Sequence, residues 1–212
     1  MKPIFVTGIG TGIGKTVISA ILTEALQADY WKPVQAGFAL GTDSLQVKSL
    51  VSHPKSRTWP ETYKLSMPAA PHLAAQTEGK TINLNTIFEH YSSISKASNL
   101  LVIEGAGGLM VPLNDKEFMH DLISRLDARV IIVSRNYLGS INHSLLTSSA
   151  CRSFGLDVIG WIFNDQYLDY EAEIAKWSGY PVLASIPHAD QLNKDFILKQ
   201  AAAVAPALKK WI

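Results

Sequence analysis

The sequence predicts an α/β protein in which a mostly parallel sheet is covered by helices on both faces. Short apolar runs alternate with segments of helical length along the chain, as in a doubly wound sheet. Several runs are apolar almost throughout, which is expected of parallel strands buried on both faces. Hydrophobic residues make up 47% of the 212 residues, enough for a sizeable core. No linker or repeat interrupts the pattern, so we expect one domain over residues 1–212.

The expected elements follow one another in a regular order. The strands lie at residues 3–8, 29–34, 99–105, 128–134, 157–164 and 180–187. The helices lie roughly at residues 15–27, 43–51, 69–77, 84–97, 116–126, 140–153, 168–178 and 190–209. Residues 52–80 form the least regular segment because they contain several prolines, and we expect a surface excursion there with one helix.

Composition and charge exclude several classes of protein. The formal net charge is +1, from 19 basic and 18 acidic residues without a lysine or arginine cluster, so we expect no nucleic-acid binding. No apolar run reaches about 18 residues and no secretory signal opens the chain, so we expect a cytoplasmic protein without membrane contact. Cys151 is the only cysteine, which makes an internal disulfide impossible, and we interpret it as a small buried residue.

A glycine-rich loop, VTGIGTGIGKT, follows the first expected strand. The usual phosphate loop reads G-x-x-x-x-G-K-[ST], but its first glycine would fall on Ile9, so this loop is one residue longer. A strand before the loop and a helix after it are the context that phosphate binding requires. Lys15 would then reach the β- and γ-phosphates, and the Thr16 hydroxyl would bind Mg²⁺. The alternative is a glycine turn without a ligand.

Charged residues follow two further strands, where ligands of parallel sheets bind. Pro33 cannot donate to a sheet ladder, so the second strand should weaken there and place Lys32 near the loop. Glu104 ends the third strand and resembles the acid that holds Mg²⁺ in phosphate-loop enzymes. The alternatives are a snorkelling lysine and a solvated strand-end acid. Asp43 could supply a metal oxygen, but sequence alone favours a helix cap.

The remaining polar positions give weaker signals. Asn164 ends the fifth strand, and its amide suits the edge of a nucleobase, although the residue alone favours an ordinary turn. The histidines show no metal-ligand spacing, and no G-x-S-x-G elbow occurs, so nucleophilic hydrolase chemistry has little support.

Taken together, these segments resemble the dethiobiotin synthetase family over nearly the whole chain. That family's loop is also one residue longer than the ordinary phosphate loop. The segments that carry the resemblance are VTGIGTGIGKT, KPVQAG, the acid in TDSLQV, PHLAA followed by EG, IEGAGG-x-x-VPL, LG-x-INHSLLT, GWIFND and SIP.

The resemblance implies a phosphate-loop NTPase fold and an ATP-dependent ligase of biotin biosynthesis. Its substrates would be 7,8-diaminononanoate, CO₂ and MgATP, and its products dethiobiotin, ADP and phosphate. A carbamate forms on one amine, and its oxygen attacks the γ-phosphate to give a carbamic-phosphoric anhydride. The second amine then closes the cyclic urea and expels phosphate.

The resemblance also implies roles for individual residues. Lys15 and Lys32 would flank the carbamate and γ-phosphate, with Thr11 beside them, and Thr16, Asp43 and Glu104 would serve Mg²⁺. The residues implied to receive the nucleotide and its metal are Gly12, Ile13, Gly14, Lys15, Thr16, Val17, Asp43, Glu104, Gly105, Ala106, Gly107, Asn164, Asp165, Ile186, Pro187 and His188.

The resemblance further implies a homodimer with its sites near the subunit interface. The helix start from the partner subunit would hold the substrate carboxylate through Gly139, Ser140, Ile141 and Asn142. Ala36 stands where the family usually has serine or threonine, so one hydroxyl contact to the substrate is absent. The family loop commonly has aspartate at the position of Gly10 and often glutamate at that of Gly12.

Other classes of protein share part of this pattern. Phosphate-loop switch ATPases of the partitioning and septum-placement type have the same sheet and resemble the chain at GKT. They carry an extra lysine five residues before the GKT lysine, and that position is Gly10 here. A glutamine-dependent amidotransferase of the cobyric-acid type would need a second domain with a cysteine nucleophile, for which the chain has no room.

Overall fold

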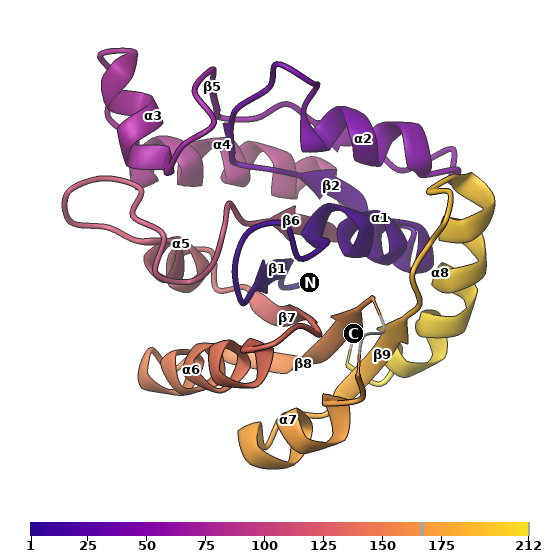
Figure 1. The fold of residues 1–212 in the computed structure, drawn as a ribbon. Coiled ribbons are helices and arrows are strands. Elements are labelled where there is room, and N and C mark those ends of the chain that lie inside the picture. Colours follow the sequence, from indigo (N-terminus) through magenta and orange to yellow (C-terminus); the bar gives the residue numbers. More distant parts are fainter. Residues whose placement is uncertain (166–167, 212) are drawn as a thin grey trace.

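A computed structural model describes residues 1–165 and 168–211 (Figure 1). Within these residues, a seven-stranded sheet forms the centre of the molecule, and all of its neighbouring strands are parallel. The strands in spatial order are β4 (Thr58–Trp59), β2 (Asp29–Trp31), β6 (Leu101–Glu104), β1 (Ile4–Gly8), β7 (Arg129–Arg135), β8 (Asp157–Asn164) and β9 (Val182–Ile186). The parallel sheet brings the carboxyl ends of these strands to one edge, where the glycine-rich loop lies.

Helices cover both faces of this sheet, as the sequence predicts (Figure 1). One face packs against α1 (Lys15–Leu26), α2 (Asp43–Leu50) and α8 (Lys194–Leu208). The other packs against α4 (Leu84–Ala97), α5 (Met119–Arg125), α6 (Ser140–Ser153) and α7 (Glu171–Ser178). The helix α3 (Pro71–Thr77) joins the same core but contacts the short strands at Val34–Ala36 and Tyr63–Leu65. Two hydrophobic cores result, one on each side of the sheet.

The alternation of side chains decides which residues reach each core. Val102 belongs to the core beneath α1, and Ile103 belongs to the opposite core. Because side chains alternate along a strand, Glu104 points to the same face as Val102. Tyr30 on β2 pairs with Val102 and lies in the same core, so Tyr30 and Glu104 both face α1.

The expected strand at residues 29–34 is wrong as a single element. It divides into β2 and β3 (Val34–Ala36), and β3 pairs with β5 (Tyr63–Leu65) in a separate two-stranded sheet. The break falls at Lys32 and Pro33, where the missing N–H of proline ends the ladder. The carbonyl of Pro33 instead accepts hydrogen bonds from the backbone N–H groups of Thr62 and Tyr63, each at 2.9 Å.

The segment at residues 52–80 is more ordered than the sequence indicates. Its expected helix is α3, but it also contributes β5 and the edge strand β4, which the sequence reading missed. The prolines around these strands obscured them. Asp29 anchors the segment, because its carboxylate accepts hydrogen bonds from the backbone N–H of Arg57 at 2.8 Å and from Trp59 Nε1 at 3.2 Å.

Cys151 is confirmed as a buried residue. It lies inside α6 with none of its surface exposed, and burial raises the pKa of its thiol to about 12. A thiol with so high a pKa is a poor nucleophile, since the thiolate is the reactive form. Among the helices of the described residues, none has both the length and the apolar character needed to cross a membrane.

Candidate active site

The glycine-rich loop joins the carboxyl end of β1 to the start of α1. Gly14 is the N-cap of α1 and has a φ of 92°, so the left-handed conformation at the helix start requires glycine. Lys15 is the first helical residue, and its Nζ donates a hydrogen bond to the carbonyl of Gly10 at 2.7 Å. Burial lowers the pKa of Lys15 to about 8, and the charge of Glu104 only partly opposes this. The lysine therefore crosses the loop with its ammonium group inside the site.

Asn164 holds the other side of the loop. It ends β8, and its Nδ2 donates a hydrogen bond to the carbonyl of Ile13 at 3.1 Å. A Cβ on Gly14 would lie only 2.1 Å from this Nδ2 atom. The interpretation of Asn164 as an ordinary turn residue is therefore wrong, because Asn164 belongs to β8 and its side chain supports the loop.

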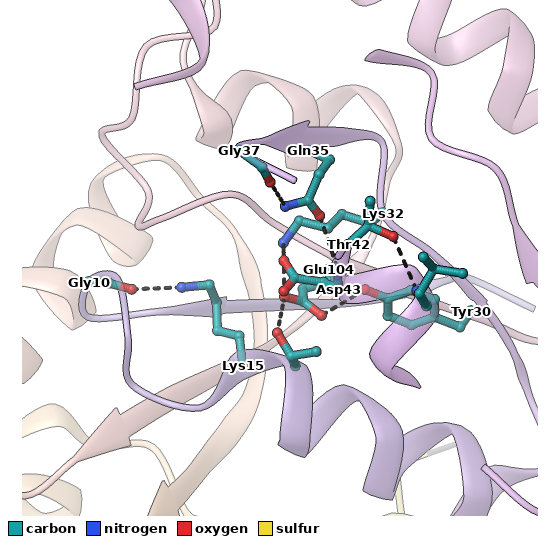
Figure 2. Close-up of polar contacts among 11 residues, drawn as sticks. Gly10, Lys15, Tyr30, Lys32, Gln35, Gly37, Thr42, Asp43 and Glu104 are labelled. Atoms are coloured by element: carbon teal, nitrogen blue, oxygen red, sulfur yellow. Dashed lines mark hydrogen bonds and ion pairs between the residues drawn. The ribbon is translucent and has the colours of Figure 1, made fainter. Parts of the chain in front are cut away.

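A buried cluster of charges lies beside the loop (Figure 2). Glu104 Oε1 accepts hydrogen bonds from Thr16 Oγ1 and from Lys32 Nζ, both at 2.9 Å. Its other oxygen, Oε2, accepts a hydrogen bond from the Tyr30 hydroxyl at 2.8 Å. Lys32 also forms an ion pair with Asp43. One lysine thus bridges two carboxylates that come from different elements.

Neighbouring strands and a capped helix bring these groups together. Trp31 pairs with Ile103 in the β2–β6 ladder, so Lys32 and Glu104 each follow paired residues at the same edge. The cap interpretation of Asp43 is wrong, because Thr42 is the N-cap of α2 and its side chain accepts a hydrogen bond from the N–H of Leu45 at 3.2 Å. Asp43 is therefore free of the capping role and directs its carboxylate to Lys32 (Figure 2).

Burial distinguishes between the alternative interpretations of Lys32 and Glu104. Only 4% of Lys32 and 2% of Glu104 is exposed, so neither a snorkelling lysine nor a solvated acid describes them. Burial lowers the pKa of Lys32, but the charges and hydrogen bonds of Glu104 and Asp43 outweigh it and hold that pKa above its usual value. Lys32 consequently stays charged, as a buried ion pair requires.

The cluster forms the wall of a cavity of about 720 Å³. Ala36 lies on the same wall, whereas a second cavity of about 850 Å³ opens on the other side of Thr11 and Gly12. Expected site residues that line the first cavity are Thr11, Gly12, Gly14, Lys15, Thr16, Val17, Lys32, Ala36, Asp43, Glu104, Ala106 and Gly107. Those that line the second are Thr11, Gly12, Ile13, Asp165 and His188.

Several expected site residues do not line either cavity. Gly105 packs against Phe5, and Ile186 is buried in the core beneath α1. The α6 start, Gly139 to Asn142, follows Leu138, which lines the second cavity and is 90% exposed. Within this chain the structure does not bring the α6 start into the first cavity.

Sequence reasoning missed three residues of the site. Tyr30 contacts Glu104. Side chains alternate along a strand, so a residue two positions before Lys32 faces the same side, and this spacing could have indicated Tyr30. Gln35 accepts a hydrogen bond from the N–H of Asp43 at 3.1 Å and donates one to the carbonyl of Gly37 at 2.8 Å. Arg135, at the end of β7, donates from Nε to Asp165 Oδ2 at 3.0 Å.

The donor set of the cluster is suited to a hard cation. In the part of the chain that the structure describes, no group of three or more histidine, cysteine, aspartate or glutamate side chains could hold a metal. The Thr16 hydroxyl and the carboxylates of Glu104 and Asp43 nevertheless share one cavity wall. Hydroxyl and carboxylate oxygens are the protein ligands that Mg²⁺ takes, usually together with phosphate oxygens and water.

The fold and this site define a phosphate-loop nucleotide-binding protein. The chain is similar in structure to a ParA family ATPase from Chlorobium tepidum TLS, with a TM-score of 0.57, 15% identity, and coverage of 99% of this chain and 93% of that one. It is also similar to the MinD cell division protein of Aquifex aeolicus, with a TM-score of 0.60, 14% identity, and coverage of 100% and 97%. At these identities the likeness shows the fold alone.

Sequence similarity identifies the family more narrowly. Residues 2–195 match the family described as AAA domain. The ATP-dependent dethiobiotin synthetase of Christiangramia forsetii is 48% identical over 90% of this chain and 91% of the relative. That of Cytophaga hutchinsonii is 45% identical over 95% and 96%. The chain belongs to the ATP-dependent dethiobiotin synthetase family.

The contact between Gly14 and Asn164 predicts an unequal effect of alanine in the loop. Gly12 has a φ of 72° with open space around it, whereas Gly14 has a similar backbone and the 2.1 Å contact. Gly12→Ala should lose about 1–2 kcal/mol from backbone strain alone. Gly14→Ala should lose more, and thermal unfolding of the ligand-free proteins measures the difference.

Asn164→Ala provides the control for this comparison. Removing the amide also removes the clash, so adding Asn164→Ala should recover part of the stability that Gly14→Ala loses. Equal melting temperatures for Gly12→Ala and Gly14→Ala would contradict this account of the loop.

Proposed function

We propose that this protein is an ATP-dependent dethiobiotin synthetase, a carbon–nitrogen cyclo-ligase contained in one domain over residues 1–212. The observation that carries the proposal is the buried Lys32, held between Glu104 and Asp43 beside the phosphate-loop Lys15. Both reacting groups, a substrate carbamate and the γ-phosphate of ATP, are anions. A cavity with two lysines can hold them together, which is the main requirement of phosphoryl transfer.

Lys15 and Lys32 divide the charge neutralisation between them. On nucleotide binding, the Lys15 ammonium exchanges the Gly10 carbonyl for phosphate oxygens. Lys32 lies across the cavity and favours the carbamate over the free diamine by its positive charge. The carbamate oxygen then attacks the γ-phosphate, ADP leaves, and the second amine closes the urea ring with release of phosphate. Thr11 borders both cavities and lies beside the reacting groups.

Thr16, Asp43 and Glu104 would hold Mg²⁺. The proposal is supported by the 2.9 Å contact between Thr16 Oγ1 and Glu104 Oε1, and by the shared lysine of the two acids. When bound, Mg²⁺ neutralises phosphate charge that develops during transfer. Lys15 and Lys32 together balance the two carboxylates in the protein alone, so the incoming phosphates bring the negative charge that a dication would offset.

The nucleotide would extend along the loop toward the ends of β8 and β9. The N–H groups of residues 12–17 would cradle the phosphates at the α1 N-terminus. Ala106 and Gly107 line the same cavity, and with Gly105 they would complete the segment that faces the nucleotide. Asn164, Asp165, Ile186, Pro187 and His188 would receive adenine. The pairing of Asp165 with Arg135, and its 3.5 Å separation from His188 Nδ1, supports a fixed wall at this end.

The diamine would bind near Ala36 and reach the partner subunit of a homodimer. There the α6 start, Gly139, Ser140, Ile141 and Asn142, would hold its carboxylate. Exposed apolar side chains near this start support a subunit contact, since Leu138 is 90% and Leu146 is 61% exposed. Substrates are small molecules, and we place the enzyme in the cytoplasm, where ATP is supplied.

The reaction itself provides the main test. Wild-type protein should release phosphate from MgATP only when both 7,8-diaminononanoate and bicarbonate are present. Lys15→Ala should lose on the order of 100-fold or more in rate, because a charge is removed from the phosphate site. An intact rate in that variant would contradict the phosphate-loop role, and release without the diamine would favour a switch ATPase.

Lys32→Gln tests the charge beside the carbamate. Glutamine keeps a polar side chain of similar length but removes the charge, so the rate should fall far more than the affinity for ATP. Turnover, calorimetric ATP binding and carbon-13 NMR of the carbamate measure these quantities. Loss of ATP binding with intact carbamate formation would show that Lys32 serves the nucleotide instead.

Asp43→Asn tests the metal assignment. Thr42 remains the cap, so the free energy of unfolding should stay within about 1 kcal/mol of wild type. The Mg²⁺ concentration for half-maximal rate should rise, because one anionic ligand is lost. Asp157→Asn is a matched control, since Asp157 pairs with Arg129 far from the cavity. Full activity of Asp43→Asn at low Mg²⁺ would leave Asp43 only as an ion-pair partner of Lys32.

A further inference from the structure

The two oxygens of Glu104 have different partners. Oε1 accepts from Thr16 and Lys32 at the cavity, whereas Oε2 points away from them and accepts from the Tyr30 hydroxyl at 2.8 Å (Figure 2). Tyr30 is fully buried and is not among the residues that line the cavity. The hydroxyl therefore reaches the site only through Glu104.

The orientation of the Glu104 carboxylate depends on this third donor. The terminal torsion of a glutamate is broad, so the carboxylate can turn unless its oxygens have fixed partners. Thr16 and Lys32 both donate to the same oxygen, Oε1, and leave Oε2 without a partner from the cavity side. A donor on Oε2 fixes the plane of the carboxylate and satisfies an oxygen that is otherwise buried without a partner.

The strand geometry holds the Tyr30 hydroxyl in place. Tyr30 lies on β2 next to Val102 of β6, and its ring packs in the core beneath α1. A carboxylate oxygen can only accept, so the Tyr30 hydroxyl is the donor in its contact with Glu104 Oε2. The ring cannot move without disturbing a closely packed core.

We propose that Tyr30 is a positioning residue that turns Glu104 Oε1 toward Thr16 and the cation site of the proposed function. Without the hydroxyl, Glu104 turns its free oxygen toward Lys32 or Thr16 and presents a less favourable ligand set. Hydrogen-bond partners of metal ligands typically contribute 10–100-fold to metal affinity or activity. A merely structural hydroxyl would contribute to stability and leave cation affinity unchanged.

Tyr30→Phe separates these roles, because it keeps the ring and removes only the hydroxyl. Binding of Mn²⁺, used as a paramagnetic substitute for Mg²⁺, is measured by electron paramagnetic resonance with saturating ADP. We expect Mn²⁺ to bind about 10-fold or more weakly to Tyr30→Phe. Tyr63→Phe is the control, because the Tyr63 hydroxyl also has a hydrogen bond, from the N–H of Asn83 at 3.0 Å, but does not contact the cluster.

A double-mutant cycle with Glu104→Gln tests whether Tyr30 acts through Glu104. Tyr30→Phe should change Mn²⁺ affinity little when Glu104 is already glutamine, since contacting residues couple. Mn²⁺ affinity of Tyr30→Phe within about twofold of both wild type and Tyr63→Phe would overturn the positioning role. Wild-type protein that bound no Mn²⁺ with ADP would overturn the cation site itself, which distinguishes the two failures.

Discussion

The buried ion pairs of Lys32 with Glu104 and Asp43 are the interaction on which the rest of the site depends. Burying a charge costs several kcal/mol unless partners compensate it, so the buried Lys32 and Glu104 require each other, and the partly exposed Asp43 adds a second anion beside Lys32. Glu104 comes from a central strand, Lys32 from the break after β2, and Asp43 from the start of α2. The cluster therefore links the sheet edge to α2, and together with Lys15 it gives the cavity wall equal numbers of positive and negative charges.

Small residues let two loops meet at this edge. A Cβ on Gly108 would lie 3.1 Å from the carbonyl of Gly8, and one on Gly105 would lie 2.8 Å from the Phe5 ring. The segment after β6 can thus lie directly against the glycine-rich loop after β1. This close approach is why Glu104 and Thr16 meet, although 88 residues separate them in the chain.

The sequence predicted the central layers well and the irregular segments poorly. The strand at residues 157–164 and the helices at 84–97 and 140–153 have the expected bounds, because apolar runs and helical patterns continue without interruption there. The strands β4 and β5 are too short for periodicity to reveal. In the site, GKT and Glu104 could be recognised as motifs. The sequence could not show that Thr42 caps α2 while Asp43 pairs with Lys32, because two adjacent polar residues can each act as a cap and only the backbone geometry decides between them. The partners of Tyr30 and Gln35 depend likewise on strand register.

The Asn164 bond to Ile13 has a thermodynamic consequence for ligand binding. The loop already has Gly14 in the left-handed conformation as its helix cap, and a side-chain tether from Asn164, before any nucleotide arrives. The conformational entropy of the loop is therefore lost during folding, and little remains to be lost on association. Nucleotide binding then becomes an exchange of hydrogen-bond partners within a rigid frame, and the heat of that exchange, more than any ordering of the chain, sets its temperature dependence.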